Sequence, residues 1–132
     1  MKYLVNLTFL LFILVSCNQN APDTSAFDKG LAMFEKNKAI ADKTFDLFIA
    51  KDLDGMMDMY ADDVVWSPAN TLDSLSKDAL REGMTGWMTE FEVFSFNERQ
   101  YYPGVDENFV PDGSVRTYGT WEGTHTSGAK TV

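Results

Sequence analysis

Hydrophobic residues recur at helical spacing along residues 26–51, and no proline interrupts this stretch. The apolar positions are Leu31, Phe34, Ile40, Phe45, Phe48 and Ile49. Because residues three and four apart line one side of a helix, and charged residues fill the other side here, the pattern predicts one long amphipathic helix. A break follows at residues 52–55. Residues 56–60 predict a second, short helix, which Asp52 or Asp54 could cap.

The next part of the chain predicts one short strand and one further helix. Residues 64–67 are mostly β-branched or aromatic and are closed by Pro68, which is typical of a short strand. Residues 69–75 are polar and predict a loop. Ser76 is a good N-cap for a third helix that runs to about Phe91. Its apolar stripe comprises Leu80, Met84, Trp87, Met88 and Phe91.

From Val93 onward the pattern alternates with a period of two, which predicts antiparallel strands. In the first strand one side carries Phe94, Phe96, Glu98, Gln100 and Tyr102. A turn signal at residues 109–113 leads into a long strand over residues 114–126. Its inward side is expected to carry Val115, Thr117, Gly119, Trp121, Gly123 and His125. Residues 129–132 open another strand that does not continue, so we expect a truncated chain that lacks about two strands.

The N-terminus has the layout of a secretory signal. Residues 1–2 give a positive start, and residues 3–15 are apolar except for Asn6 and Thr8. A membrane-spanning helix needs about 20 apolar residues, and this run is shorter. We therefore expect residues 1–16 to be a signal peptide that is removed.

A single cysteine, Cys17, follows this apolar run directly. Residues 14–17, Leu-Val-Ser-Cys, resemble the lipobox of bacterial lipoproteins, in which the cysteine becomes the first residue of the mature chain and carries the lipid. The resemblance implies a lipidated Cys17 with a polar tether to residue 26. The alternative is a free cysteine that lies near the cleavage site by chance. We expect a secreted, membrane-anchored lipoprotein on the periplasmic or cell-surface side of a bacterial membrane.

Length and charge narrow the choice of partners. Residues 1–16 contain one basic and no acidic residue, so the remaining 116 residues carry 10 basic and 20 acidic side chains, a net charge of −10. This length fits one small domain. An acidic chain argues against nucleic acid and against adhesion to anionic lipid through a basic patch. We expect one domain over residues 27–132, attached to the bilayer only through the acylated Cys17.

Long helix, short helix, strand, helix and long strands is an α+β order, with helices on one face of a curved sheet. Residues 52–66, Asp-Leu-Asp-Gly-Met-Met-Asp-Met-Tyr-Ala-Asp-Asp-Val-Val-Trp, resemble the passage "short helix, then Tyr-Ala-Asp-Asp-Val-x-Trp" of the nuclear transport factor 2-like superfamily, in its SnoaL-like branch. Residues 119–125 resemble a late strand of the same domains. The resemblance implies a cone-like curved antiparallel sheet packed against three N-terminal helices.

The same resemblance implies a pocket at the open end of the cone, lined by inward-facing residues. Carried onto this chain position by position, the candidates are Trp66, Trp87, Phe96, Glu98, Tyr102, Trp121 and His125. An aromatic cleft with few polar groups suits a small apolar or amphipathic ligand. The alternative is that these aromatic side chains simply fill the core.

His125 is the only histidine and is the natural general acid or base of the chain. If Glu98 points into the same cavity, it could orient the imidazole and hold it protonated. The alternative places His125 at a strand end near solvent and Glu98 on a solvated face. One histidine and no usable cysteine leave only carboxylates as metal ligands, so we expect neither a metal nor a cofactor.

Three functions remain open, because this fold hosts many activities. The first is a lipid-anchored domain that binds a small apolar or amphipathic ligand. The second is an enzyme that uses His125 and Glu98 for proton transfer or hydrolysis. The third is a dimeric interaction module that uses the outer face of the sheet. That face is expected to carry Arg116, Tyr118, Thr120 and Glu122.

Overall fold

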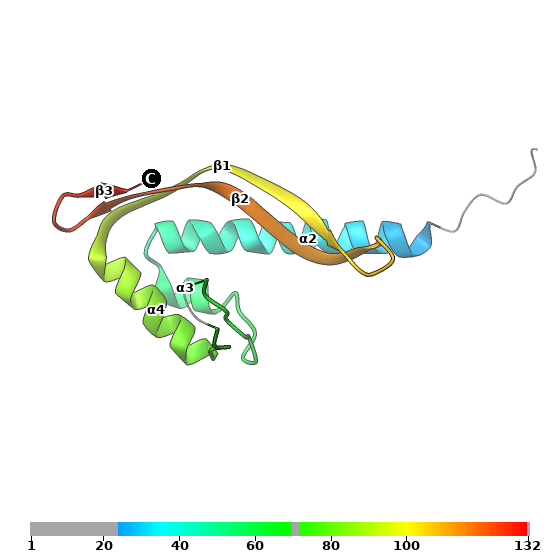
Figure 1. Cartoon of the computed structure of the whole chain (residues 1–132), viewed down its shortest axis with the longest axis horizontal. Coiled ribbons are helices and arrows are strands. Elements are labelled where there is room, and N and C mark those ends of the chain that lie inside the picture. The colour runs from blue at the N-terminus through cyan, green and yellow to red at the C-terminus, as the bar shows by residue number, and fades with distance from the viewer. Residues whose placement is uncertain (1–23, 70–71, 132) are drawn as a thin grey trace, which may run out of the picture.

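The computed structural model describes residues 24–69 and 72–131, so the expected signal peptide and Cys17 lie outside the described residues. Three helices are followed by three strands within this part of the chain (Figure 1). They are α2 (Ser25–Ile49), α3 (Leu53–Met57), α4 (Lys77–Glu90), β1 (Phe91–Val105), β2 (Pro111–His125) and β3 (Lys130–Thr131). The strands form one open antiparallel sheet in the order β1-β2-β3. The α+β class expected from the sequence is confirmed.

Side-chain caps decide where two of the helices begin. Asp52 accepts a hydrogen bond from the backbone N–H of Gly55 at 2.9 Å, so α3 begins three residues earlier than its apolar pattern predicts. Ser76 accepts one from the backbone N–H of Ala79 at 3.4 Å, and α4 begins at the next residue, as expected. In both cases the side chain satisfies an N–H group that the helix leaves without a partner.

The β1–β2 hairpin arches along α2, as Figure 1 shows, and is fastened to it at both ends. Near the hairpin tip Gly30 packs so closely on Pro111 that a Cβ on the glycine would lie 1.8 Å from the proline carbonyl oxygen. Asn37 donates a hydrogen bond to the carbonyl of Gly113 at 2.8 Å. At the other end the Lys51 ammonium donates to the carbonyl of Phe91. These contacts hold the hairpin against the helix at its tip and near its base.

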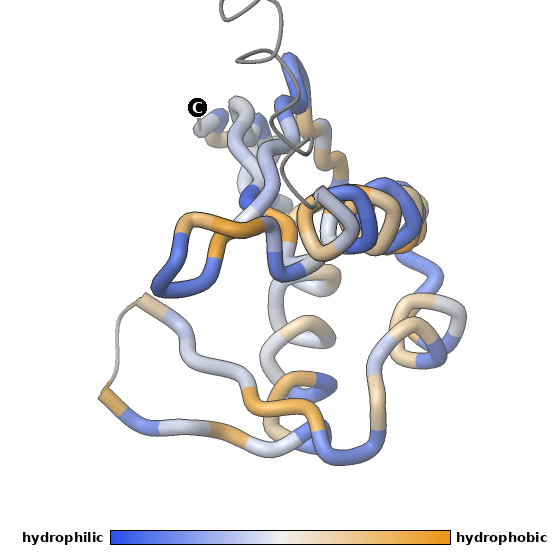
Figure 2. The backbone as a smooth tube through the Cα atoms, turned by 90° about the vertical axis from the view of Figure 1, so that its right-hand side faces the viewer, coloured by the Kyte–Doolittle hydropathy of each residue, from blue (hydrophilic) through white to orange (hydrophobic). Residues whose placement is uncertain are grey.

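The core lies below the hairpin, toward the C-terminal end of α2. The buried hydrophobic residues are Phe34, Phe48, Met56, Met57, Leu80, Phe91, Phe94 and Phe96. Four of them form one contiguous cluster: Phe48, Met56, Phe91 and Phe94. Figure 2, which looks along α2, shows α3, α4 and their connecting segment below the helix and the hairpin. The lower helices therefore meet the hairpin near its base rather than along its length.

The strand predicted for residues 64–67 does not form. Trp66 instead makes one isolated bridge with Leu75, with backbone N···O distances of 2.9 and 2.8 Å. Pro68 has no N–H group to donate, so a ladder cannot continue through it. The two paired residues hold the ends of a loop that presents the Trp66 side chain to α4.

A β-bulge near Glu98 reverses the alternation of β1. Asn97 pairs with Thr120 and Gln100 with Tyr118, so two residues of β1 oppose one residue of β2. Glu98 has a φ of 54°, in the left-handed region. An extra residue turns every later side chain to the opposite face.

Two predicted inward positions are wrong because of this bulge. Glu98 is exposed, and Tyr102 is half exposed on the outer face of the hairpin, where its ring lies 5.9 Å from that of Tyr118. Strict alternation puts Arg99 and Tyr101 on the side opposite Phe96, yet both contact Asp42 of α2. A prediction that carries a strict period of two through the bulge assigns each of these residues to the wrong face.

Candidate functional site

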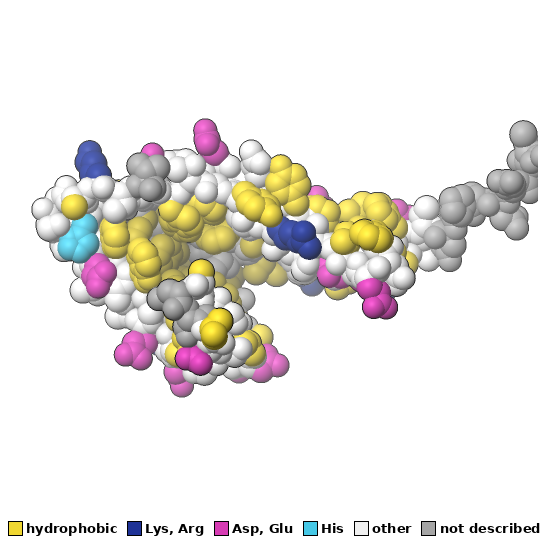
Figure 3. All heavy atoms as spheres, in the orientation of Figure 1, with side chains coloured by type: hydrophobic (Ala, Val, Ile, Leu, Met, Phe, Trp, Pro, Cys, Tyr) yellow, Lys and Arg dark blue, Asp and Glu magenta, His cyan; other side chains and the backbone are white. Residues whose placement is uncertain are grey.

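A cavity of about 460 Å³ opens between the base of the hairpin, the C-terminal half of α2 and the face of α4. In the space-filling view, hydrophobic side chains gather in a hollow between the hairpin and the helices below it (Figure 3). The lining residues are Thr44, Phe45, Phe48, Met56, Tyr60, Val64, Val65, Trp66, Leu80, Met84, Trp87, Phe91, Phe94, Trp121, Glu122, Gly123 and Thr131. The size and the apolar walls are typical of sites for small molecules.

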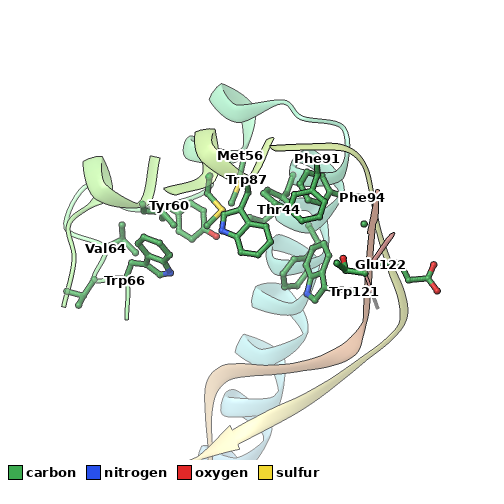
Figure 4. A pocket seen from close by; sticks show the side chains of 17 residues that line it. Thr44, Met56, Tyr60, Val64, Trp66, Trp87, Phe91, Phe94, Trp121 and Glu122 are labelled. Atoms are coloured by element: carbon green, nitrogen blue, oxygen red, sulfur yellow. The ribbon is translucent and has the colours of Figure 1, made fainter. Parts of the chain in front are cut away.

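All three tryptophans of the chain line this cavity, and each comes from a different part of the fold. Trp66 lies on the segment after α3, Trp87 on α4 and Trp121 on β2 (Figure 4). Gly83 of α4 makes room for the first of them, because a Cβ there would lie 2.8 Å from Cη2 of Trp66. The fold thus brings together three of the aromatic residues expected from the sequence.

Two of the tryptophans do not behave as core-filling side chains. Trp87 is 52% exposed and Trp121 is 38% exposed, although both have large apolar rings. Trp87 stacks on Phe91 with ring centroids 5.4 Å apart, so one of its faces is packed while much of its surface remains open. Large apolar surface left exposed inside a concavity is typical of a binding site rather than of a core.

A stack of aromatic rings supports Trp121 from behind. Its ring is parallel to that of Phe96, with centroids 4.3 Å apart and an interplanar angle of 4°. Phe45 meets both rings edge-on, at centroid distances of 4.9 Å from Phe96 and 6.0 Å from Trp121. Such arrangements add to the stability gained from burial alone. Phe96, expected in the pocket, is buried behind Trp121 and supports the wall without lining the cavity.

Arg99 braces this stack against α2. Its guanidinium donates to the carboxylates of Asp42 and Asp46 at 2.7 and 2.8 Å, and its Nε–H donates to the carbonyl of Phe96 at 3.0 Å. The same guanidinium lies 5.5 Å from the ring centroid of Phe96 and 5.9 Å from that of Phe45. Only 17% of the side chain is exposed. The bulge therefore fastens β1 to α2 at the cavity wall through hydrogen bonds and cation–π contacts.

Tyr101 belongs to the same cluster, since its hydroxyl donates a hydrogen bond to Asp42. The hydrogen bonds from Tyr101 and Arg99 lower the pKa of Asp42. Burial, followed by the bond to Asp42, raises the pKa of the Tyr101 hydroxyl. The sequence prediction missed this cluster. Its only sequence signal is the pair of carboxylates at 42 and 46, one helical turn apart on α2.

The structure does not bring Glu98 and His125 together. His125 is the last residue of β2, whereas Asn97, next to Glu98, pairs with Thr120. Five steps along β2 separate Thr120 from His125, which is about 16 Å at ~3.3 Å per residue. Glu98 is exposed, and Nδ1 of His125 lies 2.8 Å from the hydroxyl of Ser127. The two side chains cannot share a proton through a hydrogen bond or one water.

Tyr60 is a cavity residue that the sequence prediction missed. Its backbone carbonyl accepts a hydrogen bond from Lys77 at 2.8 Å, and the same ammonium lies 3.0 Å from Asp62, so the start of α4 holds this segment in place. Burial raises the pKa of the Tyr60 hydroxyl. The sequence predicted Tyr60 as the last residue of the short helix, whereas α3 ends at Met57, so no local signal pointed to the cavity.

Comparisons of the chain with protein-family models, with curated proteins and with solved structures find no match. Within residues 24–69 and 72–131, no three metal-ligating side chains gather into a site. None of the helices described there combines the length and the apolar character needed to cross a bilayer. The fold and the cavity define an α+β domain with an aromatic-lined pocket.

Proposed function

We propose that the chain is a lipid-anchored SnoaL-like domain of the nuclear transport factor 2-like superfamily, and that its cavity binds a small apolar or amphipathic ligand. The observation that carries the proposal is the convergence of Trp66, Trp87 and Trp121 on one open cavity of about 460 Å³. Covering the exposed parts of these rings removes apolar surface from water on both partners, at about 25 cal/mol per Å².

The order of elements supports the SnoaL-like part of the proposal. A long helix and a short helix capped by Asp52 come first, and the Tyr60–Trp66 passage and a long antiparallel hairpin follow. The passage that carries the resemblance also contributes two cavity residues, Tyr60 and Trp66. The residues that suggest the superfamily are therefore among those that build the pocket.

Binding is tested with N-phenyl-1-naphthylamine, an uncharged probe whose fluorescence rises in apolar surroundings. We expect a saturable signal with the protein produced from the full sequence. Trp87→Ala removes apolar surface that the probe would cover, at about 25 cal/mol per Å², so we expect affinity to fall about tenfold. Tyr118→Ala is the matched control, because it removes an aromatic ring from the outer face of the hairpin. Equal affinity of Trp87→Ala and wild type, with both proteins folded by circular dichroism, contradicts the proposed pocket.

The anchor is tested separately on Cys17. Cells that express the full chain are grown with labelled palmitate, and we expect label on the wild-type protein but none on Cys17→Ser. A single acyl chain binds a membrane only marginally, so stable membrane attachment needs more than one chain on this residue. A mature wild-type protein with an unlabelled, free Cys17 thiol rules out the anchor and leaves the pocket proposal untouched.

A further inference from the structure

Four of the hydrogen-bond donors that line the cavity belong to aromatic side chains. The lining residues include the indole N–H groups of Trp66, Trp87 and Trp121 and the hydroxyl of Tyr60. Among residues 24–69 and 72–131, none of these four groups donates to a protein acceptor. In the close-up view the Tyr60 hydroxyl and the Trp87 indole nitrogen both point toward the middle of the cavity (Figure 4).

Three further polar side chains line the cavity: Thr44, Glu122 and Thr131. The Thr44 hydroxyl donates to the carbonyl of Ile40 at 2.8 Å within α2. The Glu122 carboxylate accepts hydrogen bonds from Asn97 at 3.0 Å and from Ser95 at 3.3 Å on the outer face of the sheet. Among the residues that the structure describes, no lysine, arginine or histidine lines the cavity. A bound molecule therefore meets hydrogen-bond donors in an otherwise apolar wall. The described lining offers no positively charged side chain to balance an anionic ligand.

Tyr60 is the donor best placed to orient a ligand. Burial raises the pKa of its hydroxyl, so the group remains a neutral O–H at physiological pH. A ligand without an acceptor covers this hydroxyl and leaves it unpaired, which costs free energy. A carboxylate gives up its hydration and finds no cation in return, which costs more.

We infer that the cavity takes an uncharged, flat molecule that carries a hydrogen-bond acceptor, such as an aryl ketone, and that Tyr60 donates a hydrogen bond to that acceptor. The inference rests on the proposed pocket function. Stacking surfaces on Trp87 and Trp121 select a flat shape, and the free donor selects the polar group. Tyr60 is thus the residue that distinguishes ligands of equal shape.

The test uses three naphthalenes of matched shape: 2-acetylnaphthalene, 2-isopropenylnaphthalene and 2-naphthoate. The first two differ mainly by a carbonyl oxygen against a methylene group, and the third carries a charge. Each displaces N-phenyl-1-naphthylamine from the protein produced from the full sequence. Tyr60→Phe should weaken binding of 2-acetylnaphthalene about tenfold, the loss of one hydrogen bond, and leave 2-isopropenylnaphthalene unchanged. We expect 2-naphthoate to bind at least tenfold more weakly than the ketone.

The matched control is Tyr118→Phe, which removes the same oxygen atom from the outer face and should change none of the three affinities. A Tyr60→Phe protein that binds the ketone as tightly as wild type overturns the inference. So does a variant that loses equal affinity for the ketone and the alkene, or a carboxylate that binds as tightly as the ketone. If neither the three compounds nor N-phenyl-1-naphthylamine bind, the proposed binding function of the cavity is wrong. This outcome differs from those that overturn only the role of Tyr60.

Discussion

Gly119 of β2 lies opposite the bulge of β1 and has no space for a methyl group. A Cβ at this position would lie 2.4 Å from Cε2 of Phe96 and 2.8 Å from the carbonyl oxygen of Asn97. Both contacts are shorter than any that a real Cβ makes. The ring cannot retreat freely, because it is held between Trp121, Phe45 and Arg99. Overpacking of this kind costs about 1–3 kcal/mol, so we expect Gly119→Ala to lower the free energy of unfolding by about 2 kcal/mol.

Gly86 of α4 provides a control with the same change of atoms. A Cβ on Gly86 meets nothing within 4 Å, and the residue lies inside an exposed stretch of helix. Alanine at such a position stabilises a helix by about 0.5–1 kcal/mol relative to glycine. Urea unfolding followed by far-ultraviolet circular dichroism should shift the two variants in opposite directions from wild type. An unchanged or raised urea midpoint for Gly119→Ala refutes the packing of Phe96 beneath this position.

Three further predictions concern the bulge and its contacts with α2. Glu98 has a φ of 54°, a left-handed conformation that glycine adopts without strain and valine does not. Glu98→Gly should therefore raise the free energy of unfolding by about 1 kcal/mol, whereas Glu98→Val should lower it. Equal urea midpoints for the two variants argue against the bulge. In Arg99→Lys the single ammonium group cannot bind the carboxylates of Asp42 and Asp46 as the planar guanidinium does. This variant should be less stable by about 1 kcal/mol, which a thermal melt detects as a lower Tm. The hydrogen bonds from Tyr101 and Arg99 lower the pKa of Asp42 in the folded protein. The ionised Asp42 therefore stabilises the fold fully above its unfolded-state pKa of about 4. This stabilisation is lost as the pH falls through the lower pKa of the folded state. The stability gap between wild type and Asp42→Asn should therefore be full at pH 6 and shrink at acid pH; a gap that is constant from pH 3 to pH 7 contradicts this.

The helices are predictable from the sequence because their signals are local. Asp52 and Ser76 cap their own helices, and the apolar stripe of α2 recurs from Leu31 to Ile49, about five turns, with no proline to interrupt it. The face of each β1 residue is not predictable in the same way. It depends on a bulge in which a glutamate adopts a left-handed conformation, and glutamate is not typical of that region. The nearest sequence signal is Gly119, which lies on the other strand.

The same contrast holds for the candidate site. Trp66, Trp87 and Trp121 are expected in the pocket from the family resemblance, and all three line the cavity, although Trp66 lies on a loop and not on the expected strand. The Arg99 cluster could not be predicted, since it exists only after the bulge turns this residue toward α2. Tyr60 likewise becomes a cavity residue through the path of the chain between α3 and α4, which no local pattern determines. The apolar walls of the pocket can be predicted from its aromatic residues. The hydroxyl group that we propose to select the ligand depends on the tertiary fold.

The binding of a ligand among the three tryptophans is tested most directly by nuclear magnetic resonance of their indole groups. The chain contains three tryptophans, all of which line the cavity, so a ¹H–¹⁵N spectrum of labelled protein gives three indole signals that report on this site. Titration with 2-acetylnaphthalene should move all three signals with one dissociation constant and leave the backbone amides of the hairpin tip, residues 106–110, in place. Indole signals that stay fixed at a saturating concentration, while amides elsewhere shift, contradict ligand binding among the three tryptophans.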